Sequence, residues 1–321
     1  MKRLAITWSA LLLILMLLLP LAYYSLPALF KQPLLDLNRA LSGLSEDTVA
    51  MGPHTVHYLV GGSGEPVVLL HGIFAEKDHW VDFARPLTGR YRVIAPDLPG
   101  FGESGRLPDQ AYDYATQTAR LKTLLDGLGL GRVHLAGNSM GGTLAALFAL
   151  RYPERVASVA LVGAPHGIKT PRPSVMDGWI DAGKTPLVVH DAAQFAQMMD
   201  LLFTQRPFLP YPILQAAQAE AVRDAPSNTR LWKEQLKDRY LLDAQIGALQ
   251  QPTLVLWGAD DRLFDASGAD VLRSHLKNPH IQVLPGVGHL PMMEAPQATA
   301  QAYLRFLDEL ASASPPNLLS K

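Results

Sequence analysis

The sequence predicts an α/β fold in which a mostly parallel sheet is covered by helices on both faces. Short runs rich in β-branched residues, such as "PVVLLHG" and "RVHLAGNS", alternate along the chain with helical patterns. These runs are apolar at nearly every position, which is typical of parallel strands buried on both faces. A chain of 321 residues with 48% hydrophobic content can also bury a large core.

The alternation begins at about residue 54. "HTVHYLV" and "PVVLLHG" are expected to be strands, joined by "GGSGE" as a hairpin. "YRVIAPDLPG" and "RVHLAGNS" are the next two strands, with a helix expected between them over "DYATQTARLKTLLDGLGL". Further strands are predicted for "ASVALVGAP", "PTLVLWGAD" and "IQVLPGVGH", before a final amphipathic helix over roughly 295–310.

A stretch without obvious strands interrupts this order at residues 166–250. It is proline-rich at first and then helical and aliphatic, which predicts a helical cap, or lid, over the carboxyl edge of the sheet. A pair of ordinary peripheral helices is the alternative. The expected organisation is an anchor helix, a juxtamembrane segment, a core in two parts, the cap and a tail: 1–31, 32–53, 54–165 with 251–312, 166–250 and 313–321.

The N-terminus is expected to be a transmembrane helix. Residues 4–30 are 27 residues without a charge, enough to span a hydrocarbon core of roughly 30 Å. Lys2 and Arg3 precede them, so the positive-inside rule places the N-terminus in the cytoplasm. The chain is then a single-pass protein of the inner membrane, with the domain that follows the span in the periplasm if the cell is Gram-negative.

A cleaved signal peptide is the alternative to this anchor. The apolar run is long for a signal peptide, and no convincing small-x-small cleavage site follows it. A retained anchor also allows the chain to form a homodimer through the membrane helix.

The composition excludes several other classes of protein. A net charge of −1 without a basic tract argues against nucleic acid as a partner. The absence of cysteine excludes disulfides, thiolate metal sites and a cysteine nucleophile. The histidines show no metal-ligand spacing with acids, so no metal or cofactor is expected. "GFGESG" at 100–105 fits a dinucleotide-binding pattern, but the loop-like "RLPDQ" follows where a helix is required.

The sequence "GNSMG" at 137–141 fits the G-x-S-x-G pattern of a nucleophile elbow. A strained turn between strand and helix lifts the Ser139 hydroxyl above the sheet, and Gly137 and Gly141 relieve the crowding. The backbone N–H of Met140, at the start of the helix, can stabilise an oxyanion. A second N–H is expected from Ile73, in "LLHGIFAEKDHW".

A serine nucleophile requires a base and an orienting acid, which follow it in the order acid, then histidine, each after a strand. "VLWGADDRLF" supplies Asp260 and Asp261, and "VLPGVGHLPMMEAP" supplies His289. His71 is expected to hold the oxyanion loop in place rather than to act as a base.

Taken together, these motifs resemble those of the α/β-hydrolase superfamily, in its lipase and esterase branch, over roughly 54–311. "HGI", "DLPGFGES", "GNSMGG", "LWGADD" and "GHLPMMEAP" match its landmarks in order. More narrowly, the anchor with "HGIFAEKDHW" and "GADDRLFDASGAD" is similar to membrane-anchored monoacylglycerol lipases and to bacterial membrane-bound phospholipases A and lysophospholipases.

The resemblance implies an α/β-hydrolase fold and an ester hydrolase with Ser139 as nucleophile and His289 as base. In the family pattern the acid lies four residues after the Trp of "WG", which implies Asp261 rather than Asp260. Ile73 stands where many relatives have phenylalanine, but only its backbone amide is required.

The leading hypothesis is a membrane-anchored serine hydrolase that cleaves acyl esters of lipids at the bilayer (phospholipid, lysophospholipid or monoacylglycerol) through an acyl-enzyme. The Met-rich cap tract is expected either to line an acyl tunnel or to be ordinary core. A carbon–carbon bond hydrolase of the same fold and a non-catalytic binding scaffold are the alternatives. The candidate substrate contacts are Phe74, Trp179, Met199, Phe203 and Leu290.

Overall fold

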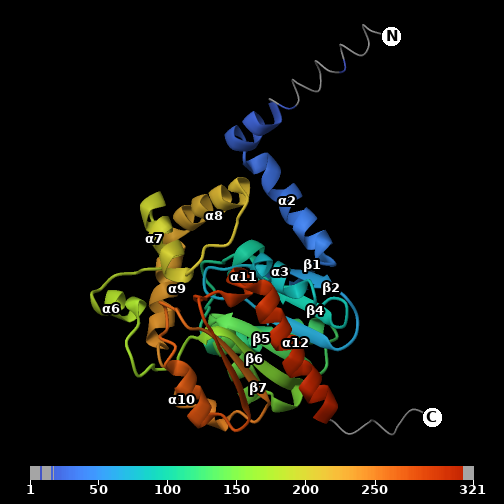
Figure 1. The fold of residues 1–321 in the computed structure, drawn as a ribbon, viewed down its shortest axis with the longest axis vertical. Coiled ribbons are helices and arrows are strands. Elements are labelled where there is room, and N and C mark those ends of the chain that lie inside the picture. Colours follow the sequence, from blue (N-terminus) through green and yellow to red (C-terminus); the bar gives the residue numbers. More distant parts are fainter. Residues whose placement is uncertain (1–7, 9–15, 17, 314–321) are drawn as a thin grey trace, which may run out of the picture.

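The computed structural model describes residues 8, 16 and 18–313, and an eight-stranded sheet forms its centre (Figure 1). The strand order is β1-β2-β4-β3-β5-β6-β7-β8. From β4 to β8 every neighbouring pair is parallel, whereas β1 pairs antiparallel with β2 and β2 antiparallel with β4. The strands are β1 (Leu44–Met51), β2 (His54–Gly61), β3 (Pro66–Leu70), β4 (Arg92–Pro96), β5 (Val133–Ser139), β6 (Val156–Pro165), β7 (Thr253–Gly258) and β8 (Pro279–Leu284).

The expected hairpin between β2 and β3 is wrong. β2 pairs with β4, and β3 lies on the other side of β4. β3 is almost entirely buried and apolar, so it takes an interior place in the sheet, whereas the half-exposed β2 lies nearer the edge. The hairpin of this region joins β1 and β2 instead, through a two-residue turn in which Gly52 has φ of 57°. The sheet therefore begins at Leu44, inside the segment that the sequence suggested as juxtamembrane.

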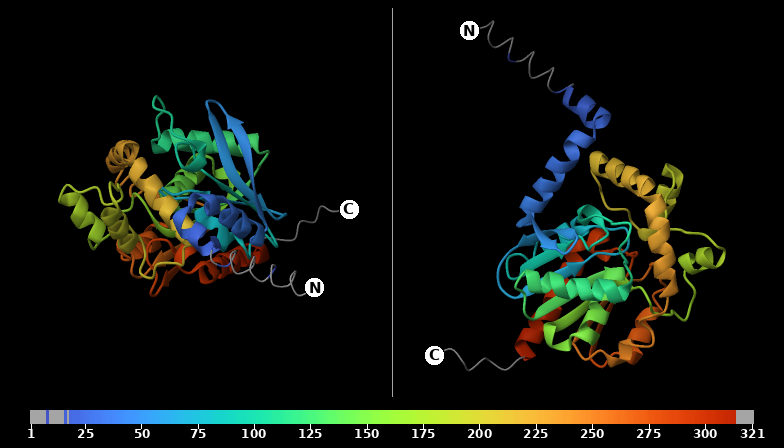
Figure 2. Two further views of the ribbon diagram at one scale, coloured as in Figure 1. Left: turned by 90° about the horizontal axis from the view of Figure 1, so that it is seen from above. Right: turned by 180° about the vertical axis from the view of Figure 1, so that it is seen from behind.

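Helices cover both faces of the sheet, as predicted for an α/β fold. Alternate side chains of β3 show the two faces: Val68 and Leu70 pack in the core on the side of α4 and α5, and Val67 and Leu69 pack towards α3 and α12. In Figure 1 α12 lies in front of the sheet, and the view from behind in Figure 2 brings α4 to the front. The helices of the core are α3 (Val81–Ala84), α4 (Tyr114–Gly127), α5 (Met140–Arg151), α10 (Gly268–His275), α11 (Pro291–Glu294) and α12 (Pro296–Ala313).

Four further helices lie between β6 and β7 and stand beside the carboxyl ends of the parallel strands (Figure 1). All four begin with a side-chain cap or a proline in the first turn; Ser174, for example, forms a capping box with Asp177. Their inner faces bury residues such as Phe195, Met199 and Trp232. These cap helices are α6 (Val175–Asp181), α7 (Ala192–Leu202), α8 (Tyr211–Arg223) and α9 (Ala225–Lys237).

A helix that precedes the sheet, α2 (Ala28–Leu41), packs along the cap helix α8. In the part of the chain that the structure describes, no helix combines the length and the apolar character that crossing a membrane requires. About half of the expected anchor, residues 1–7, 9–15 and 17, lies outside the described residues, and α2 begins within the other half, at Ala28. Residues 314–321, most of the expected tail, also lie outside the described residues. The anchor, the dimer through the membrane helix and the tail therefore stay predictions.

Candidate active site

Ser139 ends β5 at the point where α5 begins, and its backbone is strained. Its φ is 52°, and among the described non-glycine residues only Phe74 shares a positive φ. The neighbouring glycines permit this tight turn. A Cβ on Gly137 would overlap the carbonyl of Gly141, and a Cβ on Gly141 would overlap the carbonyl of Leu70. The two glycines therefore lie where the elbow pattern requires them.

Asp261 and His289 follow β7 and β8 and meet at the same edge of the sheet. His289 Nδ1 lies 2.8 Å from Asp261 Oδ2, and the two side chains are 2% and 0% exposed. The other carboxylate oxygen of Asp261 accepts the N–H groups of Leu263 and Phe264, at 2.8 and 3.1 Å. Asp260, in contrast, is exposed. The aspartate that the resemblance implied is thus the one held against the histidine.

This contact determines which nitrogen of His289 is available for chemistry. With Nδ1–H donated to Asp261, Nε2 carries the lone pair. Nε2 is buried and has no hydrogen-bond partner among the described residues. Ser139 and His289 line one cavity. A buried nitrogen without a partner, beside a serine, is suited to accept a proton during a reaction.

Ile73 and Met140 both lie beside Ser139, in the wall of a cavity. Met140 is the first residue of α5, so its N–H has no acceptor within the helix. Ile73 belongs to the loop of residues 71–76 that follows β3, called the 71–76 loop below. The two N–H groups are therefore suitably located to bind an oxyanion.

His71, at the start of this loop, is structural, as the sequence predicted. Its Nδ1 donates to the Gly72 carbonyl at 2.7 Å, and its Nε2 accepts the N–H of Leu98 at 2.9 Å. Burial lowers the pKa of His71 to about 4. The ring is therefore neutral at neutral pH and connects the loop to the segment after β4.

Two cavities meet at Ser139. The larger has a volume of about 410 Å³ and extends between α2, α7 and α8; the smaller has about 260 Å³ and lies under α6 and α9. Four of the five predicted substrate contacts line the larger one: Phe74, Met199, Phe203 and Leu290. Trp179 lines neither cavity. It packs against the core, and Lys184 lies 5.6 Å above its ring.

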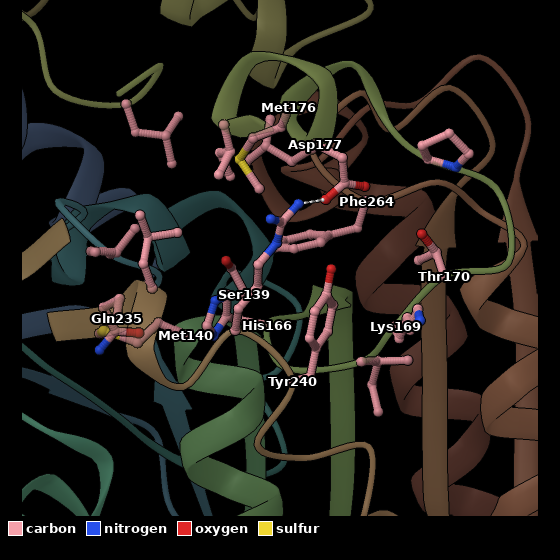
Figure 3. Close-up of a pocket in the computed structure, with 18 of the residues that line it drawn as sticks. Ser139, Met140, His166, Lys169, Thr170, Met176, Asp177, Gln235, Tyr240 and Phe264 are labelled. Carbon is pink, nitrogen blue, oxygen red and sulfur yellow. Dashed lines mark hydrogen bonds and ion pairs between the residues drawn. The ribbon is translucent and has the colours of Figure 1, made fainter. Parts of the chain in front are cut away.

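The sequence did not reveal the polar end of the smaller cavity. Arg239 forms ion pairs with Asp177 and, at 3.1 Å, with Asp181, and this contact connects the turn after α9 to α6. Figure 3 shows the pair with Asp177 above Ser139, near Phe264 and Tyr240. These residues are 62 and 58 positions apart in the chain, so no local pattern predicts the contact.

In the folded chain, one histidine lies close to two acids that the spacing along the sequence does not single out. Glu46, His57 and Glu103 bring ligand atoms within 4.8 Å of one another. The Lys77 ammonium lies in the same cluster, 3.5 Å from Glu46 and hydrogen-bonded to Glu103. Lys77 therefore offsets part of the negative charge of the cluster.

The fold and this site define an α/β hydrolase. The sequence model of the α/β hydrolase fold family matches residues 65–296, and the chain belongs to that family.

Individual relatives agree with the narrower resemblance. Over 262 residues the chain is 31% identical to Lipase 1 of Psychrobacter immobilis, covering 81% of this chain and 82% of that one. It is 30% identical to the monoacylglycerol lipase ABHD6 of Homo sapiens, covering 77% and 76%. The crystal structure of a bacterial membrane phospholipase A superposes with a TM-score of 0.87 at 38% identity, covering 98% of this chain and 100% of that one. The predicted class, a carboxylic ester hydrolase, is confirmed by these relatives.

Proposed function

We propose that the protein hydrolyses acyl esters of lipids, with Ser139 as nucleophile, His289 as base and Asp261 as the orienting acid. The observation that supports this most strongly is the buried Asp261–His289 hydrogen bond, which leaves Nε2 unpartnered in the cavity that Ser139 also lines. The positive φ of Ser139 supports it further, because such strain in a non-glycine residue is retained mainly at functional sites.

In the proposed reaction the Oγ atom of Ser139 attacks the ester carbonyl while His289 Nε2 takes its proton. The N–H groups of Ile73 and Met140 stabilise the tetrahedral oxyanion. When the intermediate collapses, His289 gives the proton to the departing alcohol and the acyl group stays on Ser139. Water, deprotonated by His289, then attacks the acyl-enzyme and releases the fatty acid.

We assign the two cavities to the two halves of the ester, the acyl chain and the alcohol. The α7 region gives the larger cavity an apolar wall with Met198, Met199 and Phe203, whereas charged residues such as Lys31, Arg106 and Glu220 line other parts of it. An acyl chain gains about 0.8 kcal/mol for each methylene it buries in such a wall. The smaller cavity ends at Lys169, Arg239 and Tyr240, so it suits the alcohol side of the ester. Phospholipid, lysophospholipid and monoacylglycerol esters all fit this description.

We place the enzyme at the inner membrane, with a single span in the uncharged run that precedes α2 and the catalytic domain in the periplasm. The uncharged run and the two basic residues before it support this topology. The similarity to a membrane phospholipase A supports membrane association. Resistance to carbonate extraction, together with a mature N-terminus at Met1 or Lys2, is the expected result; a mature protein that starts near residue 30 contradicts it.

The test of the chemistry is the Ser139→Ala variant, assayed on a panel of lipid esters, soluble p-nitrophenyl esters and a diketone. We expect the wild-type protein to react with a fluorophosphonate probe and to cleave esters but not the diketone. Ser139→Ala should lose labelling, and its turnover should fall on the order of a million-fold. Cleavage of the diketone alone indicates the carbon–carbon bond hydrolase. An unlabelled wild-type protein without turnover indicates a binding scaffold.

A further inference from the structure

The helix α2 is joined to the core by a buried ion pair between Arg39 and Asp78. Arg39 Nε lies 2.7 Å from Asp78 Oδ1, and Nη2 lies 2.6 Å from Oδ2. The two side chains are 4% and 8% exposed. The third guanidinium nitrogen donates to Glu46 at 2.6 Å. A two-point contact of this kind fixes the relative position of two backbone segments, which a single-point lysine pair does not.

Asp78 lies just beyond the 71–76 loop, in the short helix η1 (Lys77–Trp80). Lys77, its neighbour, is fully buried. The Lys77 backbone N–H donates to Asp97 Oδ1 at 2.7 Å, and Nζ donates to Oδ2 at 3.0 Å. Since His71 accepts the N–H of Leu98, the loop is held at both ends by the segment after β4. Asp78 adds a third point of attachment, and its partner is α2.

The same helix also forms part of the wall around Ser139. Lys31, Leu35 and Arg39, spaced by four residues, line the larger cavity. At its other end Lys31 forms an ion pair of 2.5 Å with Glu220 of the cap helix α8. α2 thus contacts the cap near one end and, near the other, the short helix η1 that follows the 71–76 loop.

We propose that Arg39 is a positioning residue which, through Asp78, holds the N–H of Ile73 where the oxyanion forms. This inference rests on the proposed ester hydrolysis and makes α2 necessary for the chemical step. Arg39 and Glu46 lie outside residues 65–296, so the contact is an addition to the part of the fold that the family model matches. Loss of one oxyanion donor typically costs about 100- to 1000-fold in turnover, and a displacement of about 1 Å can cost on the order of 100-fold.

The experiment compares full-length Arg39→Lys, Arg39→Met and Asp78→Asn with the wild type in detergent, on a soluble butyrate ester. Turnover is expressed per active site, counted from the final extent of fluorophosphonate labelling. We expect kcat to fall about 10- to 100-fold in Arg39→Met and Asp78→Asn, and less in Arg39→Lys, with KM changed by less than about threefold. The inhibition constant of a trifluoromethyl ketone, which binds as an oxyanion adduct of the serine, should rise in proportion.

Arg85→Met is the matched control. Arg85 also reaches α2, through Asn38 at 2.7 Å and Ser42 at 3.1 Å, and it pairs with Asp82 rather than with Asp78. We expect this variant to keep the wild-type kcat and inhibition constant. If Arg39→Met does not fold, Arg39→Lys and Asp78→Asn carry the test.

Wild-type kcat and inhibition constants per titrated site in Asp78→Asn and Arg39→Lys overturn the inference and leave the pair with a role in stability alone. Failure of the proposed function has a different signature, because it appears in the wild type as hydrolysis that survives Ser139→Ala or as no hydrolysis at all.

Discussion

Ser139 and Phe74 lie on two sides of the same reaction space, and both have a left-handed backbone. Their φ values are 52° and 58°. Such a conformation costs about 1–3 kcal/mol for a residue with a side chain. At Ser139 the packing of Gly137 and Gly141 against neighbouring carbonyls holds the turn. At Phe74 the attachments of the 71–76 loop at His71 and Lys77 do the same. Strain on both sides is consistent with a site in which nucleophile and oxyanion donors are fixed before substrate binds.

Asp261→Asn tests the assignment of the acid at this scale. An asparagine accepts from His289 less well and can hold the ring in the wrong tautomer, so we expect turnover to fall on the order of 10⁴-fold. Asp260→Asn is the matched control, because Asp260 is exposed and one residue away; its turnover should stay within a factor of about two. A severe effect at Asp260 with a mild one at Asp261 contradicts the assignment.

The sequence predicted these residues because each follows a strand, and the carboxyl ends of parallel strands converge at one edge. Ser139 and His289 therefore needed only local patterns and the order of strands, whereas the choice of Asp261 over Asp260 also needed the family pattern. Trp179 was misplaced for the opposite reason. It lies in the cap, where the sequence gives no rule for which side of a short helix faces the cavity, and its ring packs against the core.

At the scale of elements, the cap divides the space above Ser139 in two. α7 and α8 bound the larger cavity, and α6 and α9 bound the smaller one. The Arg239 ion pairs with Asp177 and Asp181 hold the turn after α9 against α6. Each cavity contains one buried methionine from a cap helix, Met199 in the larger and Met176 in the smaller. Because each cavity has one such methionine, the same substitution in each can test which cavity holds the acyl chain.

Met199→Trp should shorten the acyl chain that the enzyme accepts. The larger side chain fills part of the apolar wall, and losing burial of two methylenes costs about 1.6 kcal/mol, or roughly 15-fold. We expect kcat/KM on a p-nitrophenyl laurate to fall by that factor relative to the butyrate. Met176→Trp, the matched control, should leave the ratio of laurate to butyrate unchanged. If only Met176→Trp lowers this ratio, the acyl chain occupies the smaller cavity.

The elements that the sequence missed depend on contacts between distant segments. β1 lacks an apolar run because most of its side chains are partly or fully exposed, so its pattern resembled a linker. Arg39 is similarly hidden. Its partners Glu46 and Asp78 lie 7 and 39 residues away in the sequence. Charged residues near Arg39 in the sequence are typical of a solvent-exposed surface. Helix and strand periodicity finds cores, whereas buried ion pairs are visible only once the chain is folded.

At the scale of the whole molecule, the sheet and the cap enclose several titratable groups in apolar surroundings. Burial lowers the pKa of His71, His79 and His166 to about 4 in each case. Burial raises the pKa of Glu76, in the wall of the larger cavity, to about 8, and the charges of Asp78 and Asp97 add to this effect. All four groups are thus held neutral by the fold at pH 7, and they link its stability to pH.

The free energy of unfolding should therefore increase with pH between about 4.5 and 6.5. Each histidine has a native pKa below its usual 6.5, so its contribution is fully present above pH 6.5 and is lost as the pH falls towards 4. Glu76 opposes this: its contribution is present below pH 4.5 and is lost as the pH rises towards 8. Burial also lowers the pKa of His54 and His134 and raises that of Asp97. Because the histidines outnumber the carboxyl groups, the unfolded chain binds more protons than the native one in this window. The slope is then of the order of 1–3 kcal/mol per pH unit.

Urea unfolding at fixed ionic strength, at pH 5.0 and pH 6.5, measures this slope. The predicted sign requires a higher urea midpoint at pH 6.5. His71→Gln removes one of these histidines, so its stability should be lower at both pH values but should change less between them, by up to about 1.4 kcal/mol per pH unit. His190→Gln, at an exposed histidine of the cap, should leave the slope as it is. A wild-type urea midpoint that is unchanged or falls between pH 5.0 and 6.5 would show that these histidine rings are not buried in the neutral form. The role of His71 in holding the 71–76 loop would then have to be abandoned.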